Sequence, residues 1–431
     1  MESNPNNQIK EPSPIYRWSV LIFVSLAMFG NYYIYDSISP VFDLLSSELN
    51  FTDQQLGLLY TVYSIAAIIV LLIGGFIIDK FGTKKSILVF AVICLIAAAV
   101  TAISSEFYIM MAGRFILGIG AEPLIVAVTT ALAKWFKGKT LSLAFGLNLT
   151  IARLGSWAAD LSPGWARPFY ENWQDPLWLA TAIAGISVAG AILYWAMESS
   201  AERKYDLGSA GETDKFELKG LYSFSKSYWY IVALCVVFYS TVFPFRAFAI
   251  YYFQQAHGLE RDAAGILNSL LPLAAMIATP LFGLWVDKVG KRSIFMIVGT
   301  IILFPLFLVV TYMPPGDLIS VTIPFIGSGE IPLTLLIVMV LLGISFSMIP
   351  AVMWPAVAYI VDQFLGYEGS AIKVLPHRCR WFKPHALMAV NNTKDGWILE
   401  GQPDIVAEIG FRFEPHSNRA EYLPQQNVNQ L

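Results

Sequence analysis

Two oppositely charged side chains, Glu122 and Arg153, lie inside long apolar stretches of the chain. A charge at the centre of a bilayer costs about 2.5–3.5 kcal/mol on insertion scales, so it is expected to face a cavity and a partner. A carboxylate binds an ammonium group, and a guanidinium binds a carboxylate through two parallel hydrogen bonds. The two residues therefore predict a site for a zwitterionic ligand. The alternative is that Glu122 and Arg153 neutralise each other, and such a resting pair can still open to admit a ligand.

Three further residues are candidates for lining the same site. Asp36 lies in a polar part of the first apolar stretch and is either a proton site or the capped end of a helix. Arg246 follows Pro244 and would add positive charge to the lining. Trp354 precedes Pro355 and is either an aromatic wall for ligand side chains or ordinary packing. The predicted ligand-binding residues are Glu122, Arg153, Trp354, Arg246 and Asp36.

A short motif occurs twice, as GFIIDKFGTKK at Gly75–Lys85 and as GLWVDKVGKR at Gly283–Arg292, with its aspartates 208 residues apart. A repeat of this kind indicates a chain built from two related halves. Each aspartate is predicted at a helix end, where nearby helix N-termini and basic residues favour a carboxylate; a solvated basic loop is the alternative. The two copies of the motif contain Asp79, Lys80 and Gly82, and Asp287, Lys288 and Gly290.

The composition indicates the kind of protein that must position these residues. Of 431 residues, 56% are hydrophobic and only 14% are charged, whereas a soluble domain carries about 25% charged residues. The mean hydropathy of +0.59 is that of a multi-span membrane protein. A net charge of −3 argues against a nucleic-acid partner. Three cysteines without a CxxC pair predict no disulfide framework, and neither a metal nor a cofactor is expected.

A spanning helix needs roughly 20 mostly apolar residues, and ten stretches meet that rule. Their continuous apolar character excludes transmembrane strands, so the fold class is an all-α integral membrane protein. Connecting segments on one side carry 16 Lys and Arg, and those on the other side carry two, which predicts that both termini are cytoplasmic. The ten predicted spans are residues 17–43, 54–78, 86–104, 107–130, 140–160, 177–197, 227–256, 263–286, 293–313 and 333–362.

The predicted spans and the segments between them divide the chain into four parts. Residues 1–197 form an N-terminal six-helix half, and residues 198–226 form a polar cytoplasmic linker. Residues 227–363 form an incomplete C-terminal half of four helices. The loop at 314–332 is rich in Pro and Gly. Residues 364–431 are a polar tail without an apolar run of spanning length, predicted to form no membrane domain and to be mostly disordered or poorly packed on the cytoplasmic side.

The repeated Asp-(Lys)-x-Gly loop resembles the signature loop of the major facilitator superfamily. Seven further segments look like its lysosomal dipeptide transporter branch: YYIYD at Tyr32–Asp36, GRFILGIGAE at Gly113–Glu122, WFKGK at Trp135–Lys139, GLNLTIARLGS at Gly146–Ser156, VFPF at Val242–Phe245, NS at Asn268–Ser269 and MWPAVAY at Met353–Tyr359. The resemblance covers residues from about 20 to 365, in order.

The resemblance implies a two-half transporter that moves dipeptides by facilitated diffusion. It implies that Glu122 and Arg153 bind the two dipeptide termini and that Asp79 and Asp287 hold the cytoplasmic ends of the halves together. The residues that the resemblance predicts to act as a gate are Asp79, Lys80, Gly82, Asp287, Lys288 and Gly290. It also implies an accessory membrane glycoprotein as partner and a lysosomal or cell membrane, although residues 1–16 contain no acidic dileucine signal. The family fold has twelve spans, and ten are recognisable here. After Gln363 the family pattern stops, so the tail is either a frame-shifted reading or a genuine extension.

The leading hypothesis is therefore a dipeptide uniporter that works by alternating access. One alternative is a proton-coupled organic-anion carrier, with Arg153 and Arg246 for the anion and Asp36 or Glu122 for the proton. Another is a membrane regulator that does not transport, because two spans are missing. No His lies in a predicted span and no nucleophile motif is present, so no enzyme is predicted.

Overall fold

A computed structural model describes residues 12–136, 140–205, 226–290, 292–314, 316–323, 327–353 and 356, and the strand residues 389–393, 396–400, 411–414 and 419–422. Contacts divide the chain into two compact units. The first consists of Met1–Phe216 and Phe238–Val352, and the second of Glu217–Val237 and Met353–Leu431.

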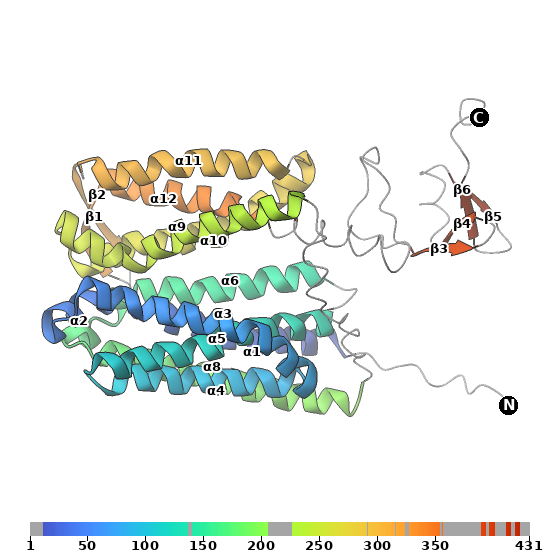
Figure 1. Cartoon of the computed structure of the whole chain (residues 1–431), viewed down its shortest axis with the longest axis horizontal. Helices are drawn as coiled ribbons and strands as arrows, with labels where there is room; N and C mark the ends of the chain where they lie inside the picture. Colours follow the sequence, from blue (N-terminus) through green and yellow to red (C-terminus); the bar gives the residue numbers. More distant parts are fainter. Residues whose placement is uncertain are drawn as a thin grey trace. The chain divides into compact units, whose positions relative to one another are not determined.

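The N-terminal set of helices runs from α1 to α8 (Figure 1). α5 packs between α3 and α4, and α1 packs against α6 and α8. The set comprises α1 (Pro14–Asp36), η1 (Ser39–Val41), α2 (Phe42–Leu49), α3 (Asp53–Phe81), α4 (Thr83–Ile103), α5 (Phe107–Phe136), α6 (Leu141–Asp160), α7 (Ser162–Trp165), η2 (Arg167–Glu171) and α8 (Asp175–Glu202).

The C-terminal set begins after the segment 206–225, which lies outside the described residues. α10 packs against α12 within this set and against α6 of the N-terminal set. The set comprises α9 (Lys226–His257), α10 (Arg261–Val289), α11 (Arg292–Tyr312) and α12 (Leu333–Met348). The predicted Pro- and Gly-rich loop contains an antiparallel hairpin of β1 (Leu318–Ile323) and β2 (Gly327–Pro332).

Nine helical segments of the described chain are long and apolar enough to cross a membrane, and they match nine of the ten predicted spans. The remaining predicted span, at 140–160, is present as the 20-residue helix α6. Its polar side chains, Asn148, Thr150, Arg153, Ser156 and Asp160, explain why α6 is less apolar than the others. α9 also ends at His257, one residue beyond the predicted span.

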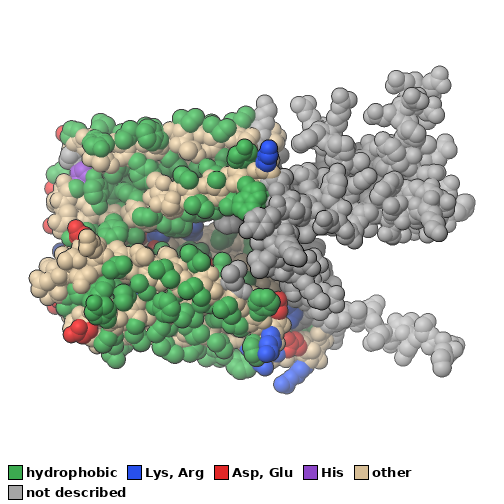
Figure 2. Space-filling view, viewed as in Figure 1, with side chains coloured by type: hydrophobic (Ala, Val, Ile, Leu, Met, Phe, Trp, Pro, Cys, Tyr) green, Lys and Arg blue, Asp and Glu red, His purple; other side chains and the backbone are tan. Residues whose placement is uncertain are grey.

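Large apolar side chains cover the outside of both helix sets. Ile68, Phe76 and Phe304 are 71%, 73% and 69% exposed. On the face in Figure 2, hydrophobic side chains cover the flanks of the helices, and charged ones appear mainly toward the helix ends. This surface fits the hydrocarbon of a bilayer, because lipid rather than water would surround it.

Glycine and proline can make a helix flexible, but α5 continues as one helix through Gly118, Gly120 and Pro123. Its glycines serve packing. A Cβ at Gly118 would lie 2.4 Å from the Tyr63 carbonyl oxygen of α3, and a Cβ at Gly120 would lie 2.8 Å from Cys94 Sγ of α4. The missing side chains let α5 approach both neighbours closely.

The second unit contains four described strands in the tail, where the sequence predicts little regular structure. They form one antiparallel sheet in the order β3-β4-β6-β5, and the rest of the tail lies outside the described residues. The strands are β3 (Ala389–Thr393), β4 (Gly396–Glu400), β5 (Phe411–Glu414) and β6 (Arg419–Tyr422).

Candidate substrate site

Glu122 projects from α5 toward α3 and is partly buried. The Tyr63 hydroxyl of α3 donates a hydrogen bond to Glu122 Oε1 at 2.9 Å. Within the described part of the chain, Glu122 and Arg153 form no ion pair, so the mutual neutralisation considered from the sequence is not seen. The other carboxylate oxygen, Oε2, receives no hydrogen bond from the described residues.

Arg153 of α6 lies between two aromatic rings that belong to different helix sets. Its guanidinium carbon is 5.7 Å from the ring centroid of Tyr32 in α1 and 5.8 Å from that of Phe346 in α12. Both are cation–π distances, worth about 0.5–2 kcal/mol each. No acidic partner of Arg153 is found among the described residues. The guanidinium fork therefore keeps its capacity to bind a carboxylate.

Asp36 and Arg246 lie together, bonded to each other across the two helix sets. Arg246 Nη1 donates to both Asp36 carboxylate oxygens at 2.9 and 3.0 Å, and Nη2 donates to Asp160 Oδ2 at 3.0 Å. Asn268 Nδ2 donates to Asp160 Oδ1 at 2.9 Å. We call these four residues the buried network, because each is at most 5% exposed.

The buried network joins α1 and α6 of one set to α9 and α10 of the other. It holds two carboxyl groups that share one guanidinium. Removing one partner of a buried ion pair costs about 3–5 kcal/mol, because the remaining charge has no compensation. Sequence reasoning found Asp36 and Arg246 but missed Asp160, which stands at the last position of a predicted span. Asn268 was noticed only as part of the NS motif.

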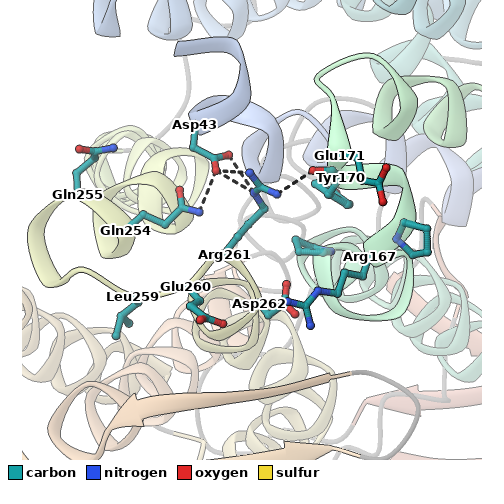
Figure 3. A pocket seen from close by; sticks show the side chains of 12 residues that line it. Asp43, Arg167, Tyr170, Glu171, Gln254, Gln255, Leu259, Glu260, Arg261 and Asp262 are labelled. Atoms are coloured by element: carbon teal, nitrogen blue, oxygen red, sulfur yellow. Dashed lines mark hydrogen bonds and ion pairs between the residues drawn. The ribbon is translucent and has the colours of Figure 1, made fainter. Parts of the chain in front are cut away.

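A second ionic cluster joins the two helix sets near the end of the helices at which Asp43 lies. Arg261 Nε of α10 donates to Asp43 Oδ2 of α2 at 2.9 Å, and Arg261 Nη1 donates to the Tyr170 carbonyl at 3.3 Å. Gln254 Nε2 of α9 donates to Asp43 at 3.3 Å. Figure 3 shows the Arg261 and Gln254 side chains pointing to Asp43. We call Asp43, Tyr170, Gln254 and Arg261 the rim cluster, and this end of the helices the Asp43 end.

The rim cluster borders an open cavity of about 750 Å³ that is also lined by Arg167, Glu171 and Asp262. In Figure 3 the Arg167 side chain points toward Asp262. Burial raises the pKa of the Tyr170 phenol well above its ordinary range, so this group stays neutral at physiological pH. Its hydroxyl lies 2.5 Å from Ser162 Oγ.

The rim cluster and the buried network lie on matching faces of the same helices. Gln254 follows Arg246 by eight residues on α9, and Asn268 follows Arg261 by seven on α10. Seven or eight residues are two helical turns, about 10–12 Å. The Ser39 hydroxyl donates to the Ala247 carbonyl at 2.7 Å between the two levels. The Asp43 end is therefore closed at two depths.

The opposite end, where α3 ends and α4 begins, contains the predicted gate residues; we call it the Lys84 end. Asp79, Lys80 and Lys288 are exposed there. Gly82 and Gly290 have φ of +80° and +70°, which favours glycine at these two turns. The Asp287 side chain lies outside the described part. The gate role of the six residues stays a prediction.

Glu198 is the ionic centre of the N-terminal set at the Lys84 end, and sequence reasoning missed it. It is 1% exposed. Lys134 Nζ, Trp135 Nε1 and the Tyr194 hydroxyl each donate to its carboxylate at 2.6 Å. Lys84 also pairs with Glu202. These contacts hold α4, α5 and α8 together within one set.

Trp354, the last predicted ligand-binding residue, lies outside the described residues. Among the residues that are described, no three His, Cys, Asp or Glu side chains gather closely enough to hold a metal ion.

Apolar helices of membrane length, arranged in two sets around charged side chains, define a multi-pass membrane transporter. The chain belongs to the major facilitator superfamily, because the model of that family matches residues 24–375.

The chain is similar to curated proteins named lysosomal dipeptide transporter MFSD1. It is 30% identical to the Danio rerio protein over 377 residues, which covers 83% of this chain and 77% of that protein. It is 31% identical to the Homo sapiens protein over 371 residues, covering 82% and 75%.

Solved structures agree on the fold. A bacterial homolog to the human lysosomal transporter Spinster, in an inward-facing and unoccupied conformation, superposes with a TM-score of 0.61 at 14% identity, covering 82% of this chain and 80% of that chain. The nucleoside transporter NupG gives 0.56 at 15% identity, covering 81% and 87%.

Proposed function

We propose that the chain is a dipeptide uniporter that works by alternating access, and that it is not an enzyme. The observation that carries the proposal is the state of Glu122 and Arg153. They lie on consecutive long helices, α5 and α6, and neither is neutralised by the other. Among the described residues, one Glu122 oxygen accepts no hydrogen bond and the Arg153 guanidinium contacts aromatic rings, and these groups suit the ammonium and carboxylate ends of a zwitterion.

The relatives named as dipeptide transporters support the choice of a dipeptide among zwitterions. In this proposal Glu122 binds the ammonium group, and Arg153 binds the carboxylate bidentately. Tyr32 and Phe346 line the carboxylate end, one from each helix set. Trp354 remains a candidate for contacting the peptide side chains.

Alternating access requires the two sets to part at one end while they meet at the other. The buried network and the rim cluster close the Asp43 end, so both must open to admit a ligand from that side. The excess of Lys and Arg in the connecting segments favours placing the Lys84 end and both termini in the cytoplasm. Asp79 and Asp287 would then hold the cytoplasmic end in the opposite state. A lysosomal membrane and an accessory glycoprotein are further parts of this proposal, carried by family resemblance.

The geometry gives less support to an organic-anion carrier. Arg246, the second cation of that hypothesis, is already bonded to the Asp36 and Asp160 carboxylates. The remaining hypothesis, a membrane regulator that does not transport, predicts that no ligand is taken up.

The test is binding and uptake with the full chain in detergent and in proteoliposomes. Alanyl-alanine is compared with free alanine and with succinate, a dicarboxylate. We expect alanyl-alanine alone to raise the melting temperature and to enter the liposomes saturably without a proton gradient. Preference for succinate would favour the anion carrier, and binding without uptake would favour the regulator.

A further inference from the structure

Arg114 of α5 is a buried cation without an anion beside it. It is 1% exposed, and no carboxylate contacts it among the described residues. Backbone carbonyls of α1 and α3 accept its hydrogen bonds at 3.3–3.5 Å. Its guanidinium carbon lies 5.5, 5.0 and 5.7 Å from the ring centroids of Tyr35, Tyr60 and Tyr63. A buried charge in a protein is ordinarily paired, and here carbonyl oxygens and the faces of three tyrosine rings take the place of an anion.

Tyr63 connects this cation to the candidate site. Its ring is one wall of the aromatic cage around Arg114, and its hydroxyl donates to Glu122 Oε1 at 2.9 Å. Tyr63 is 6% exposed, and its ring packs edge-on against Tyr35 with centroids 4.7 Å apart. The hydroxyl is therefore fixed in direction by its surroundings.

The backbone of Tyr63 is also held close to α5. A Cβ at Gly118 would lie 2.4 Å from the Tyr63 carbonyl oxygen. Gly118 stands halfway between Arg114 and Glu122, which are eight residues apart on α5, about 12 Å along the helix. One tyrosine therefore spans the distance between the buried cation and the carboxylate.

We propose that Tyr63 is a positioning residue for ligand binding: its hydroxyl, held by the aromatic cage around Arg114, orients the Glu122 carboxylate and favours its charged form. A hydrogen bond donated to a carboxylate favours its charged form, whereas burial alone favours the neutral acid. A protonated Glu122 loses its charge attraction to an ammonium group. With Tyr63 on Oε1, Oε2 stays available for the ligand. The ligand part of this inference rests on the proposed function.

The first test compares alanyl-alanine with N-acetyl-alanyl-alanine, which has no ammonium group. Tyr63→Phe keeps the ring beneath Arg114 and removes only the donor. We expect the affinity for alanyl-alanine to fall about tenfold, equivalent to 1.4 kcal/mol, and the affinity for the acetylated peptide to stay unchanged. Equal losses for both peptides would overturn the positioning role.

Tyr60→Phe is the matched control. Tyr60 belongs to the same cage, but its buried hydroxyl has no hydrogen-bond partner among the described residues. Removing that hydroxyl should leave the ratio of the two affinities unchanged. A change as large as that of Tyr63→Phe would show that the cage, rather than the contact with Glu122, matters.

The second test needs no ligand. A hydrophobic carbodiimide modifies protonated carboxyl groups, and the pH midpoint of Glu122 modification is read by peptide mass spectrometry, with Glu122→Gln as blank. Besides Tyr63, the titratable side chains of the described chain that interact electrostatically with Glu122 are Tyr32 and Tyr35 of α1, and both remain in Tyr63→Phe. We expect the midpoint to rise by about one pH unit in Tyr63→Phe.

The two tests separate this inference from the proposed function. If the wild-type protein binds both peptides equally or neither, the ammonium role of Glu122 is wrong, and the carbodiimide midpoint still decides whether Tyr63 keeps Glu122 ionised. If the midpoint does not move in Tyr63→Phe, the inference is wrong even when alanyl-alanine binds.

Discussion

Glu122 and Arg153 are each held by aromatic side chains and not by one another. Tyr63 holds the carboxylate through its hydroxyl, and Tyr32 and Phe346 hold the guanidinium through their ring faces. A direct ion pair would leave an unpaired charge whenever one member was replaced. Here Glu122 or Arg153 can be replaced without removing an ionic partner from the other residue. The two ends of the site can therefore be tested independently.

We expect Glu122→Gln and Arg153→Lys each to abolish saturable dipeptide binding while leaving the unfolding temperature within a few degrees of wild type. Lysine keeps the positive charge but lacks the planar fork that binds a carboxylate bidentately. Thermal-shift titration measures this. Acetylation of the peptide amine should weaken binding to wild type far more than to Glu122→Gln. Unchanged affinity in both variants would rule out the assignment.

In the buried network, the number of charges left without a partner predicts which substitution destabilises the protein more. Arg246→Gln leaves two buried carboxylates facing each other and should destabilise by about 3–5 kcal/mol. Asp160→Asn leaves one carboxylate with one guanidinium, which is a balanced pair, and should cost less. Unfolding temperatures in detergent measure the order, with exposed Glu106→Gln as the control. A larger drop in unfolding temperature for Asp160→Asn than for Arg246→Gln would contradict this prediction.

The sequence identified charged residues but not their partners. Asp36 and Arg246 were recognised because charges inside apolar stretches are rare. Their bond joins residues 210 positions apart, and a single sequence carries no signal for such a pairing. Asp160 was missed because it ends a predicted span, where a charge is ordinary. Glu198 was missed for the same reason.

At the scale of elements, the apolar runs predicted the helices well because a bilayer imposes length and composition together. The hairpin β1–β2 was not predicted, although LISVTI at Leu318–Ile323 alternates between more and less exposed residues. Its Pro and Gly content suggested a loop. The contacts between helices also required the structure, since the glycines of α5 could mark either flexibility or close packing.

Gly118 offers a direct test of the packing explanation. We expect Gly118→Ala to destabilise by about 1–3 kcal/mol, because the new Cβ would meet the Tyr63 carbonyl of a neighbouring helix. Gly75→Ala and Gly185→Ala are matched controls in helices, since nothing lies within 4 Å of a Cβ there. Each should be neutral or stabilising by up to about 1 kcal/mol. Equal unfolding temperatures for all three variants would favour the flexibility explanation.

At the scale of the whole molecule, the two levels of closure at the Asp43 end should control which side is open. Ser39→Cys is a suitable reporter, because Ser39 is 3% exposed and lies between the sets. In a background with Cys94, Cys235 and Cys379 replaced by serine, Arg261→Gln should increase the rate of maleimide labelling at position 39. An unchanged rate would mean that the rim cluster does not contribute to closure.

The same reporter tests the gate motif in the opposite direction. If Asp79 holds the sets together at the Lys84 end, Asp79→Asn should favour the state that is closed at the Asp43 end. A shift of about 1–2 kcal/mol would lower the labelling rate at position 39 roughly 5- to 30-fold. Faster or unchanged labelling would leave only a solvated basic loop as the explanation of the motif.

The tail carries the last prediction. We expect residues 366–431, most of which lie outside the described residues, to form no membrane domain, because they contain no apolar run of spanning length. Reading the genomic DNA past codon 363 in the other two frames is the check. If neither frame encodes two more apolar spans, the tail is a genuine extension that includes the sheet β3–β6.

The position of Arg153 between Tyr32 and Phe346 affects the step in which an empty transporter returns its site to the first side of the membrane. A transporter whose positive charge is compensated only by its ligand has to remain loaded in order to close, and it is thereby restricted to exchanging one solute for another. Here the ring faces come from both helix sets, so they stabilise the cation while the sets are together and the site is vacant. If the chain is the proposed uniporter, these contacts would give the unloaded protein a closed state through which it can reorient. Net flux down a gradient, without a solute to carry back, is the transport mode that this arrangement favours.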